Sequence, residues 1–481
     1  MTVTTAHTGH SSISRNLRNR HSLTRVVELL GMGKFQYKIL IAAGLCFAAD
    51  AMEVLLLSFL AVAVQNEWEL NDAQAATITS VVFAGALLGT LTLGRLGDSI
   101  GRRPVVIMTA VLITAFGVGT AFTTSYQMLL WTRFMVGFGV GGLTVPFDIL
   151  AEFLPTTHRG KNLLAIEYFW TAGTLLVPTL AYFTIGNTPA SSNWRLFCIL
   201  CAVPCLISTL LAICWVPESP RWLCTVGRQD QAMDILRKAA KVNGQEWIYP
   251  MQLKEETAEE TGNLCSKKYR CLTCQLWMVW CGYAIMYYGT IMTVTLIFQN
   301  VQKDGNEFSF DYGAIFASCS AEFFGTTLVI LTIDLIGRIP SQVTTFLLGG
   351  ISVCFLCFAQ SFDMPRIVLI AFAFLARLFI MAASCTTWVS TAEILPTDIR
   401  TTGHSAANAA ARLGGFFAPY LVSSGNSQHT IGIVMLVISI LISIIVSKLP
   451  ETRGMTMGAA SKPQRDIEIP KSAIHPMKDV M

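Results

Sequence analysis

The chain has 481 residues, of which 53% are apolar and only 13% are charged. Soluble domains usually carry about 25% charged residues, so this composition excludes an ordinary soluble protein. The formal net charge is only +4, and no basic tract is dense enough for nucleic acid, which requires a concentrated basic face. The composition therefore indicates a membrane protein with no nucleic-acid partner.

Apolar runs recur along the chain after residue 38, and residues 1–38 are polar and basic without the short apolar core of a signal peptide. A membrane-spanning helix needs about 20 mostly apolar residues. Twelve runs meet this requirement: 39–64, 74–94, 104–123, 128–151, 162–186, 195–216, 276–299, 312–333, 341–361, 366–391, 403–424 and 429–448. The sequence therefore predicts an all-α polytopic membrane protein with twelve transmembrane helices in a lipid bilayer.

The loops between these runs differ in charge. Lys or Arg occurs before the first run and after the second, fourth, eighth and tenth, whereas the loop 65–73 carries Glu67, Glu69 and Asp72. Positively charged loops tend to stay in the cytoplasm. We therefore expect both termini in the cytoplasm of a multi-pass protein, in the plasma membrane or in a vesicle or other endomembrane.

The two halves of the chain repeat one another. Residues 151–156 (Ala-Glu-Phe-Leu-Pro-Thr) recur as residues 392–397 (Ala-Glu-Ile-Leu-Pro-Thr), and residues 217–219 (Pro-Glu-Ser) recur as residues 450–452 (Pro-Glu-Thr). Each copy follows the corresponding apolar run, so the pattern predicts a duplication of six helices. Two parallel six-helix repeats are an architecture of secondary transporters, with the binding site between the repeats near the bilayer midplane.

A long polar loop separates the two repeats, and its residues 231–241 have helical character. Cys265, Cys271 and Cys274 in this loop have no histidine nearby, so reduced thiols are expected there rather than a zinc site with four ligands. We expect a cytoplasmic tail at 1–38, a six-helix half at 39–217, a cytoplasmic linker at 218–275, a second half at 276–449 and a cytoplasmic tail at 450–481.

Several segments resemble the major facilitator superfamily of membrane carriers. Residues 94–103 (Gly-Arg-Leu-Gly-Asp-Ser-Ile-Gly-Arg-Arg) are similar to the family's loop between its second and third helices, although Ser99 and Ile100 stand where a basic and an aromatic residue are usual. Residues 217–222 (Pro-Glu-Ser-Pro-Arg-Trp) resemble a signature of the sugar-porter-like branch. Residues 31–38 look most like the part of that branch that holds the synaptic-vesicle-two-related and bacterial nicotinate transporters.

This resemblance implies a secondary active or facilitative transporter and not an enzyme. Relatives in the branch carry organic cations, nicotinate-like anions or sugars. We therefore expect a small organic ion as the substrate, with a sugar as the alternative, carried by alternating access in symport with protons. A second hypothesis is a non-transporting vesicle or membrane receptor or trafficking partner. We expect a monomer without cofactor or metal.

Ionisable residues inside a membrane are costly, about 2.5–3.5 kcal/mol each on insertion scales, and so they point to function. Asp50 and Glu53 are three residues apart and therefore share a helical face, as do Glu167 and Trp170. A carboxylate pair suits a proton acceptor or a cation site, and tryptophan offers a flat ring to a cation. We expect the substrate and proton site to include Asp50, Glu53, Arg133, Glu167, Trp170, Tyr287, Tyr288, Glu322, Arg377, Asn408 and Arg412.

Each of these residues also has a structural interpretation. The acids could be neutralised by arginines or hydrogen-bonded to a neighbouring helix. The arginines could hold a substrate carboxylate with a two-pronged contact or pair with the acids. The tyrosines could be interfacial anchors. The sequence leaves these alternatives open.

Charged residues in the cytoplasmic loops have a different expected role. The resemblance implies that they form salt bridges that lock the inner gate in the outward-facing state. We expect this gate to include Asp98, Arg102, Arg103, Glu152 and Arg159 in the first half, and Asp334, Arg338, Glu393 and Arg400 in the second.

Overall fold

A computed structural model describes most of the chain. The described residues are 20–155, 159–186, 193–245, 252–253, 264–301, 308–395, 399–422 and 425–453. Within these ranges, 11 helices are long and apolar enough to cross a membrane. A further long helix, α16 (Arg400–Leu421), packs between two of them, α4 and α12, and occupies the place of the eleventh expected span. The expected all-α, twelve-helix fold is therefore confirmed.

The first half holds the first six expected spans. Its helices are α3 (Lys34–Glu67), α4 (Asp72–Ile100), α5 (Arg102–Thr120), α6 (Tyr126–Val140), α7 (Thr144–Phe153), α8 (Arg159–Thr184) and α9 (Trp194–Trp215). The fourth span, expected as one helix over 128–151, is divided into α6 and α7 by a turn at residues 141–143. Pro146 accounts for this break, because a proline has no backbone N–H and its ring crowds the carbonyl four residues before it.

The second half repeats this arrangement. Its helices are α12 (Arg270–Ile297), α13 (Tyr312–Ile336), α14 (Arg338–Ser361), α15 (Arg366–Ile394), α16 and α17 (Gln428–Val446). Helix α12 begins before the expected start at 276, because its first turns continue the helix into polar residues beyond the apolar run. Strands β3 (Gln299–Val301) and β4 (Phe308–Phe310) form a short antiparallel pair between α12 and α13.

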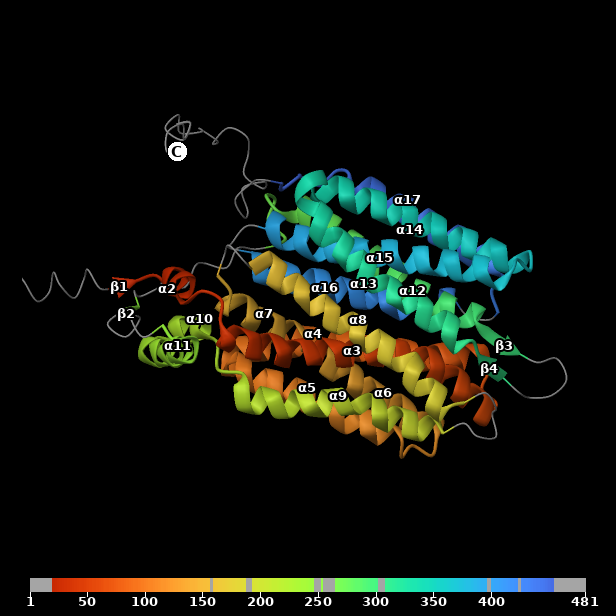
Figure 1. The fold of residues 1–481 in the computed structure, drawn as a ribbon, viewed down its shortest axis with the longest axis horizontal. Helices are drawn as coiled ribbons and strands as arrows, with labels where there is room; N and C mark the ends of the chain where they lie inside the picture. Colours follow the sequence, from red (N-terminus) through yellow and green to blue (C-terminus); the bar gives the residue numbers. More distant parts are fainter. Residues whose placement is uncertain are drawn as a thin grey trace, which may run out of the picture.

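Short elements gather at one end of the helices, which we call the linker end. They are α2 (Leu23–Leu30), α10 (Pro220–Thr225), α11 (Gln229–Asn243), β1 (Arg20–His21) and β2 (Gln252–Leu253) (Figure 1). Helix α11 confirms the helix expected over 231–241. Asn243 fastens it to α3, because the Asn243 side chain accepts a 3.0 Å hydrogen bond from the backbone N–H of Phe35 and donates a 2.8 Å bond to Gln36 Oε1.

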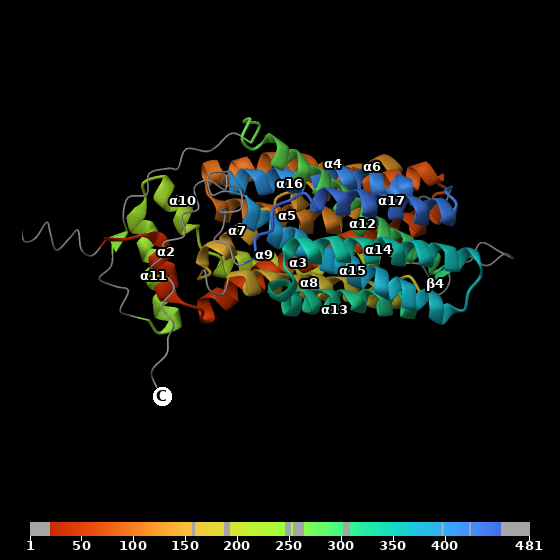
Figure 2. The ribbon, with the colours of Figure 1, turned by 90° about the horizontal axis from the view of Figure 1, so that it is seen from above.

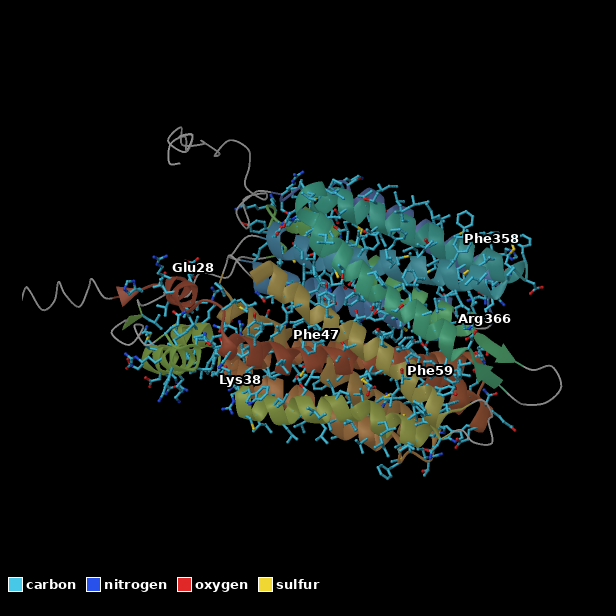
Figure 3. All side chains as sticks on the ribbon, viewed as in Figure 1. Glu28, Lys38, Phe47, Phe59, Phe358 and Arg366 are labelled. Carbon is cyan, nitrogen blue, oxygen red and sulfur yellow. The ribbon has the colours of Figure 1, made fainter. Side chains whose placement is uncertain are left out.

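The two halves lie side by side, and their long helices run between the linker end and the opposite end (Figures 1 and 2). Lys38 on α3 lies near the linker end, whereas Arg366 lies near the opposite end (Figure 3). Helix α4 packs against α16 across the interface between the halves, and α8 packs against α13. These pairs of helices enclose the site described below.

Within the first half, α4 and α6 approach backbone to backbone. A Cβ atom added to Gly85 would collide with the carbonyl oxygen of Phe134, and one added to Gly137 would collide with the carbonyl oxygen of Val82. Glycines spaced four residues apart allow this close approach of membrane helices. Helices α4 and α6 therefore form a tightly packed part of the first half.

Candidate functional site

Glu53 is neutralised inside the first half. Its Oε2 lies 2.7 Å from Nη1 of Arg133, and the side chain of Arg133 is completely buried. The Nε of Arg133 also donates a 3.0 Å hydrogen bond to Thr120 Oγ1. A membrane acid and a membrane arginine, 80 positions apart in sequence, therefore form a buried ion pair between α3 and α6.

Glu322 is neutralised in the same way in the second half. Its Oε1 accepts a 2.7 Å bond from Nη2 of Arg377 and a 3.1 Å bond from the hydroxyl of Tyr287. Its Oε2 accepts a 3.0 Å bond from the hydroxyl of Thr174, which belongs to α8 of the first half. The Glu322–Arg377 pair is thus both a buried ion pair and a connection between the halves.

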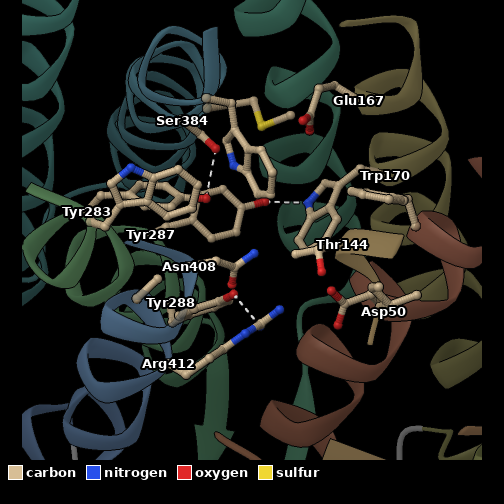
Figure 4. A pocket seen from close by; sticks show the side chains of 16 residues that line it. Asp50, Thr144, Glu167, Trp170, Tyr283, Tyr287, Tyr288, Ser384, Asn408 and Arg412 are labelled. Atoms are coloured by element: carbon tan, nitrogen blue, oxygen red, sulfur yellow. Dashed lines mark hydrogen bonds between the residues drawn. The ribbon is translucent and has the colours of Figure 1, made fainter. Parts of the chain in front are cut away.

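A cavity lies between the halves, and we call it the central cavity (Figure 4). Its walls come from α3, α7 and α8 of the first half and from α12, α15 and α16 of the second. The lining residues are Phe47, Asp50, Leu143, Thr144, Glu167, Trp170, Trp280, Tyr283, Tyr287, Tyr288, Met381, Ser384, Trp388, Asn408, Ala411 and Arg412.

Three ionisable side chains in this wall lack the neutralising partner that Glu53 and Glu322 have. Among the described residues, Asp50 Oδ1 is buried without a hydrogen-bond partner, and Glu167 has no side-chain hydrogen bond or ion pair. Arg412 donates a 3.3 Å bond to the hydroxyl of Tyr288, and its Nε has no partner in the same described ranges. Charges are expensive to bury unpaired, which makes this wall the candidate binding site.

Aromatic side chains form much of the remaining wall. Trp170 Nε1 donates a 2.5 Å hydrogen bond to the hydroxyl of Tyr287, and Ser384 donates a 2.8 Å bond to the hydroxyl of Tyr283. The rings of Trp280 and Trp388 pack edge to face, with centroids 4.9 Å apart. The cavity can therefore surround a ligand with rings and offer a few fixed polar groups.

The structure separates the predicted site residues into two groups. Those that line the central cavity are Asp50, Glu167, Trp170, Tyr287, Tyr288, Asn408 and Arg412. Glu53, Arg133, Glu322 and Arg377 lie outside its wall, in the two ion pairs. The prediction omitted Trp280 and Trp388, whereas Tyr283 was expected on the same helical face as Tyr287. A signal was available for Trp280, because Trp280, Tyr283 and Tyr287 recur at the spacing of one helical face.

A second cavity extends from the central cavity toward the linker end. The two cavities share Thr144, Glu167 and Trp388, and the second one reaches Arg102 and Glu393. A cavity at the opposite end shares no lining residue with the central one. Between them, the ring of Phe83 packs 4.6 Å from that of Tyr288. The central cavity therefore leads toward the linker end.

The predicted gate residues of the first half gather at the linker end. Arg102 pairs with Glu152, which also accepts a hydrogen bond from the hydroxyl of Ser219. Glu218 accepts bonds of 2.8 and 3.1 Å from the backbone N–H groups of Arg102 and Arg103. We call these residues the first linker-end cluster. All of them belong to the first half or to the segment that directly follows it.

The second half builds the same cluster from the repeated motifs. Arg338 donates bonds of 2.9 and 3.0 Å from Nε and Nη2 to Glu393, which also accepts a 2.6 Å bond from Thr452. Glu451 accepts a 3.0 Å bond from the backbone N–H of Arg338. Asp334 pairs with Arg338 at 2.9 Å. The internal repeat seen in the sequence is therefore also a repeat of contacts.

Among the remaining predicted gate residues, Asp98 and Arg103 do not belong to the ion pairs of these two clusters. The backbone carbonyl of Asp98 accepts a 2.8 Å bond from Trp222 Nε1, and Arg103 Nη2 donates a 2.8 Å bond to the carbonyl of Ile213. The side chains of Arg159 and Arg400 lie outside the described residues. Within the described part of the chain, no group of three His, Cys, Asp or Glu side chains is placed to hold a metal ion.

Two repeated six-helix halves around a polar central cavity define a membrane transporter of the major facilitator fold. A model of the sugar (and other) transporter family matches residues 47–462. The chain belongs to this family, whose members are transporters and not enzymes.

Several known proteins are similar to this chain over most of its length. It is 32% identical to a synaptic vesicle 2-related protein of Xenopus laevis, over 90% of this chain and 82% of the relative. It is 31% identical to the organic cation/carnitine transporter 7 of Arabidopsis thaliana, over 90% and 95%. The solved structure of the proton:xylose symporter XylE matches with a TM-score of 0.69 at 22% identity, over 89% and 98%, which shows a shared fold.

Proposed function

We propose that this protein is a secondary transporter that carries a small organic ion through the central cavity by alternating access, with Asp50 as the proton-carrying group. One observation supports this above all: Asp50, Glu167 and Arg412 face the cavity without ion-pair partners in the described chain, whereas Glu53 pairs with Arg133 and Glu322 pairs with Arg377. Unpaired charges in a membrane are retained where they bind a substrate or a proton.

The same proposal includes an orientation of the protein in the membrane. Helix α3 begins at Lys34 near the linker end, where Lys38 lies, and ends with Glu67 toward the opposite end (Figures 1 and 3). Positive charge favours the cytoplasmic side. With the linker end in the cytoplasm, the central cavity leads inward, and the two linker-end clusters brace each half where the halves must separate. A single chain encloses the whole cavity, so a monomer suffices.

An organic ion is favoured over a sugar as the substrate. Sugar sites rely on uncharged hydrogen-bonding groups and aromatic rings, whereas this wall places a carboxylate, Glu167, and a guanidinium, Arg412, against the ligand. The name of the Arabidopsis relative refers to organic cations and carnitine. The relatives named for synaptic vesicles support a vesicle membrane as the location, with the plasma membrane as the alternative.

Uptake into proteoliposomes tests the proposal. Purified full-length protein would be supplied with labelled tetraethylammonium, nicotinate and glucose, with and without an inward proton gradient. We expect accumulation of one organic ion that the gradient stimulates, and its loss in Asp50→Asn. Uptake equal to empty liposomes for every solute would contradict transport and favour a receptor or trafficking role. Accumulation of glucose alone would identify a sugar carrier.

A further inference from the structure

Asp148 on α7 is a further acid of the first half that lacks a partner. Its side chain is half-buried and forms no ion pair and no side-chain hydrogen bond with the residues that the structure describes. Glu152, one turn later on the same helix, is paired with Arg102. An unpaired acid within a membrane-spanning segment is a candidate functional group, and Asp148 lies between the central cavity and the linker end.

Helix α7 carries a row of polar side chains that leads away from the central cavity. Thr144, Asp148 and Glu152 are four residues apart, which places them on successive turns of one helical face. Thr144 lines both the central and the second cavity, whereas Asp148 and Glu152 line the second. The hydroxyl of Thr144 points toward the carboxylate of Asp50 (Figure 4). The row therefore connects the proposed proton-carrying group with the first linker-end cluster.

The spacing of this row suits water-mediated proton transfer. Four helical residues rise about 6 Å along the axis, about twice the length of a hydrogen bond. One bridging water is enough to connect the turn of Thr144 with the turn of Asp148. Asp148 and Thr144 also line a third cavity at the linker end, beside α4 and α16. The carboxylate of Asp148 is therefore reached from two cavities that extend toward the linker end.

The charges around Asp148 do not lock it in one protonation state. Arg102 attracts the ionised carboxylate, whereas Glu152 and Asp98 repel it. Further ionisable groups line the second and third cavities: Arg95, Glu167, Arg221, Glu393 and His404. Because Arg102 is already paired with Glu152, Asp148 is free to gain and lose a proton.

We infer that Asp148 is a second proton-binding group, which accepts the proton that Asp50 releases and passes it on to the linker end. The ionised carboxylate of Asp148 takes the proton through water, and Asp50 becomes ionised. Protonated Asp148 then gives the proton to water in the second cavity and returns to its ionised form. This inference rests on the proposed proton-coupled transport and adds the route by which the proton leaves.

Labelling with N,N′-dicyclohexylcarbodiimide tests the proton site without any substrate, because this reagent attacks protonated carboxyl groups in apolar surroundings and leaves an N-acylurea adduct. Purified full-length protein in lipid nanodiscs would be labelled over a range of pH, digested and analysed by mass spectrometry. We expect an adduct at Asp148 whose yield rises as the pH falls, and little adduct at Glu152, which Arg102 holds ionised on the same helix. No adduct at Asp148, or equal labelling of the two acids, would overturn the inference.

Transport by a near-isosteric variant tests the role of the site. In proteoliposomes, Asp148→Asn should slow gradient-driven uptake of the solute that the wild type accumulates from labelled tetraethylammonium, nicotinate and glucose. We expect a loss of at least about tenfold, since positioned acids and bases contribute factors of about 10²–10⁴. Exchange without a gradient should fall much less, because it requires no net release of protons. Asp234→Asn, on the exposed part of α11, is the control and should transport like the wild type.

Two rescues separate a proton-transfer role from a structural one. Asp148→Glu should recover most of the uptake rate, because it returns a carboxylate to the same turn of α7. Imidazole buffer at the linker end should also speed uptake by Asp148→Asn, because a small diffusible base replaces the missing proton acceptor. A slow variant that neither the glutamate nor the buffer rescues would overturn the inference in favour of a structural role.

Failure of this inference is distinguishable from failure of the proposed function. If Asp50→Asn loses accumulation while Asp148→Asn accumulates solute at the wild-type rate, the proposed function stands and the inference is wrong. If Asp148 is labelled with the expected pH dependence while no solute is taken up, the proton site stands and transport is wrong.

Discussion

The indole Nε1 of Trp170 donates a 2.5 Å hydrogen bond to the hydroxyl of Tyr287, and this bond joins the two halves of the molecule inside the cavity wall. The same hydroxyl donates a 3.1 Å bond to Glu322, which Arg377 neutralises. A group in the cavity wall is therefore linked, through two hydrogen bonds, to a buried ion pair of the second half. Movement of the halves must break or rearrange this chain of bonds.

The Trp170–Tyr287 bond predicts a measurable coupling. In a double-mutant cycle of Trp170→Phe and Tyr287→Phe, we expect a coupling free energy of about 0.6 kcal/mol and at most about 1.7 kcal/mol, which are the mean and the maximum found for hydrogen bonds between membrane helices. The measurement is reversible unfolding in mixed detergent micelles. Tyr182→Phe is a control, because Tyr182 is 53% exposed. A coupling indistinguishable from zero would mean that this bond does not hold the halves together.

The buried Glu53–Arg133 pair predicts a large stability loss when one partner is removed. Glu53→Gln should cost about 3–5 kcal/mol of unfolding free energy, because it leaves a completely buried arginine without its counter-charge. Asp234→Asn, which breaks the exposed Asp234–Arg237 pair of α11, should cost about 0–1 kcal/mol. Thermal unfolding of both variants in one detergent gives the comparison. Similar losses for the two would contradict the structural role of Glu53.

The backbone conformation and close contacts at Gly101 predict that only glycine fits at this position of the linker end. Its φ is +107°, and an added Cβ atom would lie 2.5 Å from Oε2 of Glu218. Gly101→Ala should therefore displace Glu218 from the backbone N–H groups of Arg102 and Arg103, and lower the melting temperature. Gly119→Ala is the matched control, since nothing lies within 4 Å of a Cβ atom there. An unchanged melting temperature for Gly101→Ala would show that the first linker-end cluster does not depend on this close approach.

Glu451 predicts a pH dependence of stability. Burial raises the pKa of Glu451, but hydrogen bonds from the backbone N–H groups of Arg338, Ile339, Arg453 and Thr452 outweigh it and hold the pKa below the ordinary value of 4.5. A group whose pKa is lowered by folding stabilises the folded state above its unfolded pKa, and loses that contribution as the pH falls through the folded pKa.

The matched comparison for this pH effect is Glu451→Gln, which cannot ionise. The melting temperature of the wild type should exceed that of Glu451→Gln at neutral pH. The difference should shrink as the pH is lowered below about 4.5, the ordinary pKa of a glutamate. A difference that stays constant down to pH 3 would show that the ionised carboxylate of Glu451 does not stabilise this end of α14.

The architecture was predictable because the membrane imposes a simple rule on the sequence. Long apolar runs, charged loops and a repeated motif each follow from local composition, and together they predicted the twelve helices and the two halves. The break between α6 and α7 was not predicted, because a short turn inside an apolar run leaves the mean hydropathy of that run unchanged. Pro146 and the adjacent glycines were its only local signal.

The site was only partly predictable. Asp50 and Glu53 share a spacing that puts them on one helical face, yet Asp50 lines the central cavity and Glu53 pairs with Arg133. Whether a membrane acid is paired depends on which helix packs beside it, and that partner lies far away in sequence. Glu167 and Trp170 kept their predicted shared face, because only one helix was needed to bring them together.

The central claim is that one cavity carries both the solute and the proton, and that Asp50 binds the proton. The most direct test compares two assays of Asp50→Asn in proteoliposomes, with labelled tetraethylammonium, nicotinate and glucose as the panel. One assay measures exchange of labelled for unlabelled solute without a gradient, and the other measures accumulation driven by an inward proton gradient. We predict that the variant keeps exchange of the solute that the wild type accumulates, and loses the accumulation. Gradient-driven accumulation by Asp50→Asn at the wild-type level would contradict the account.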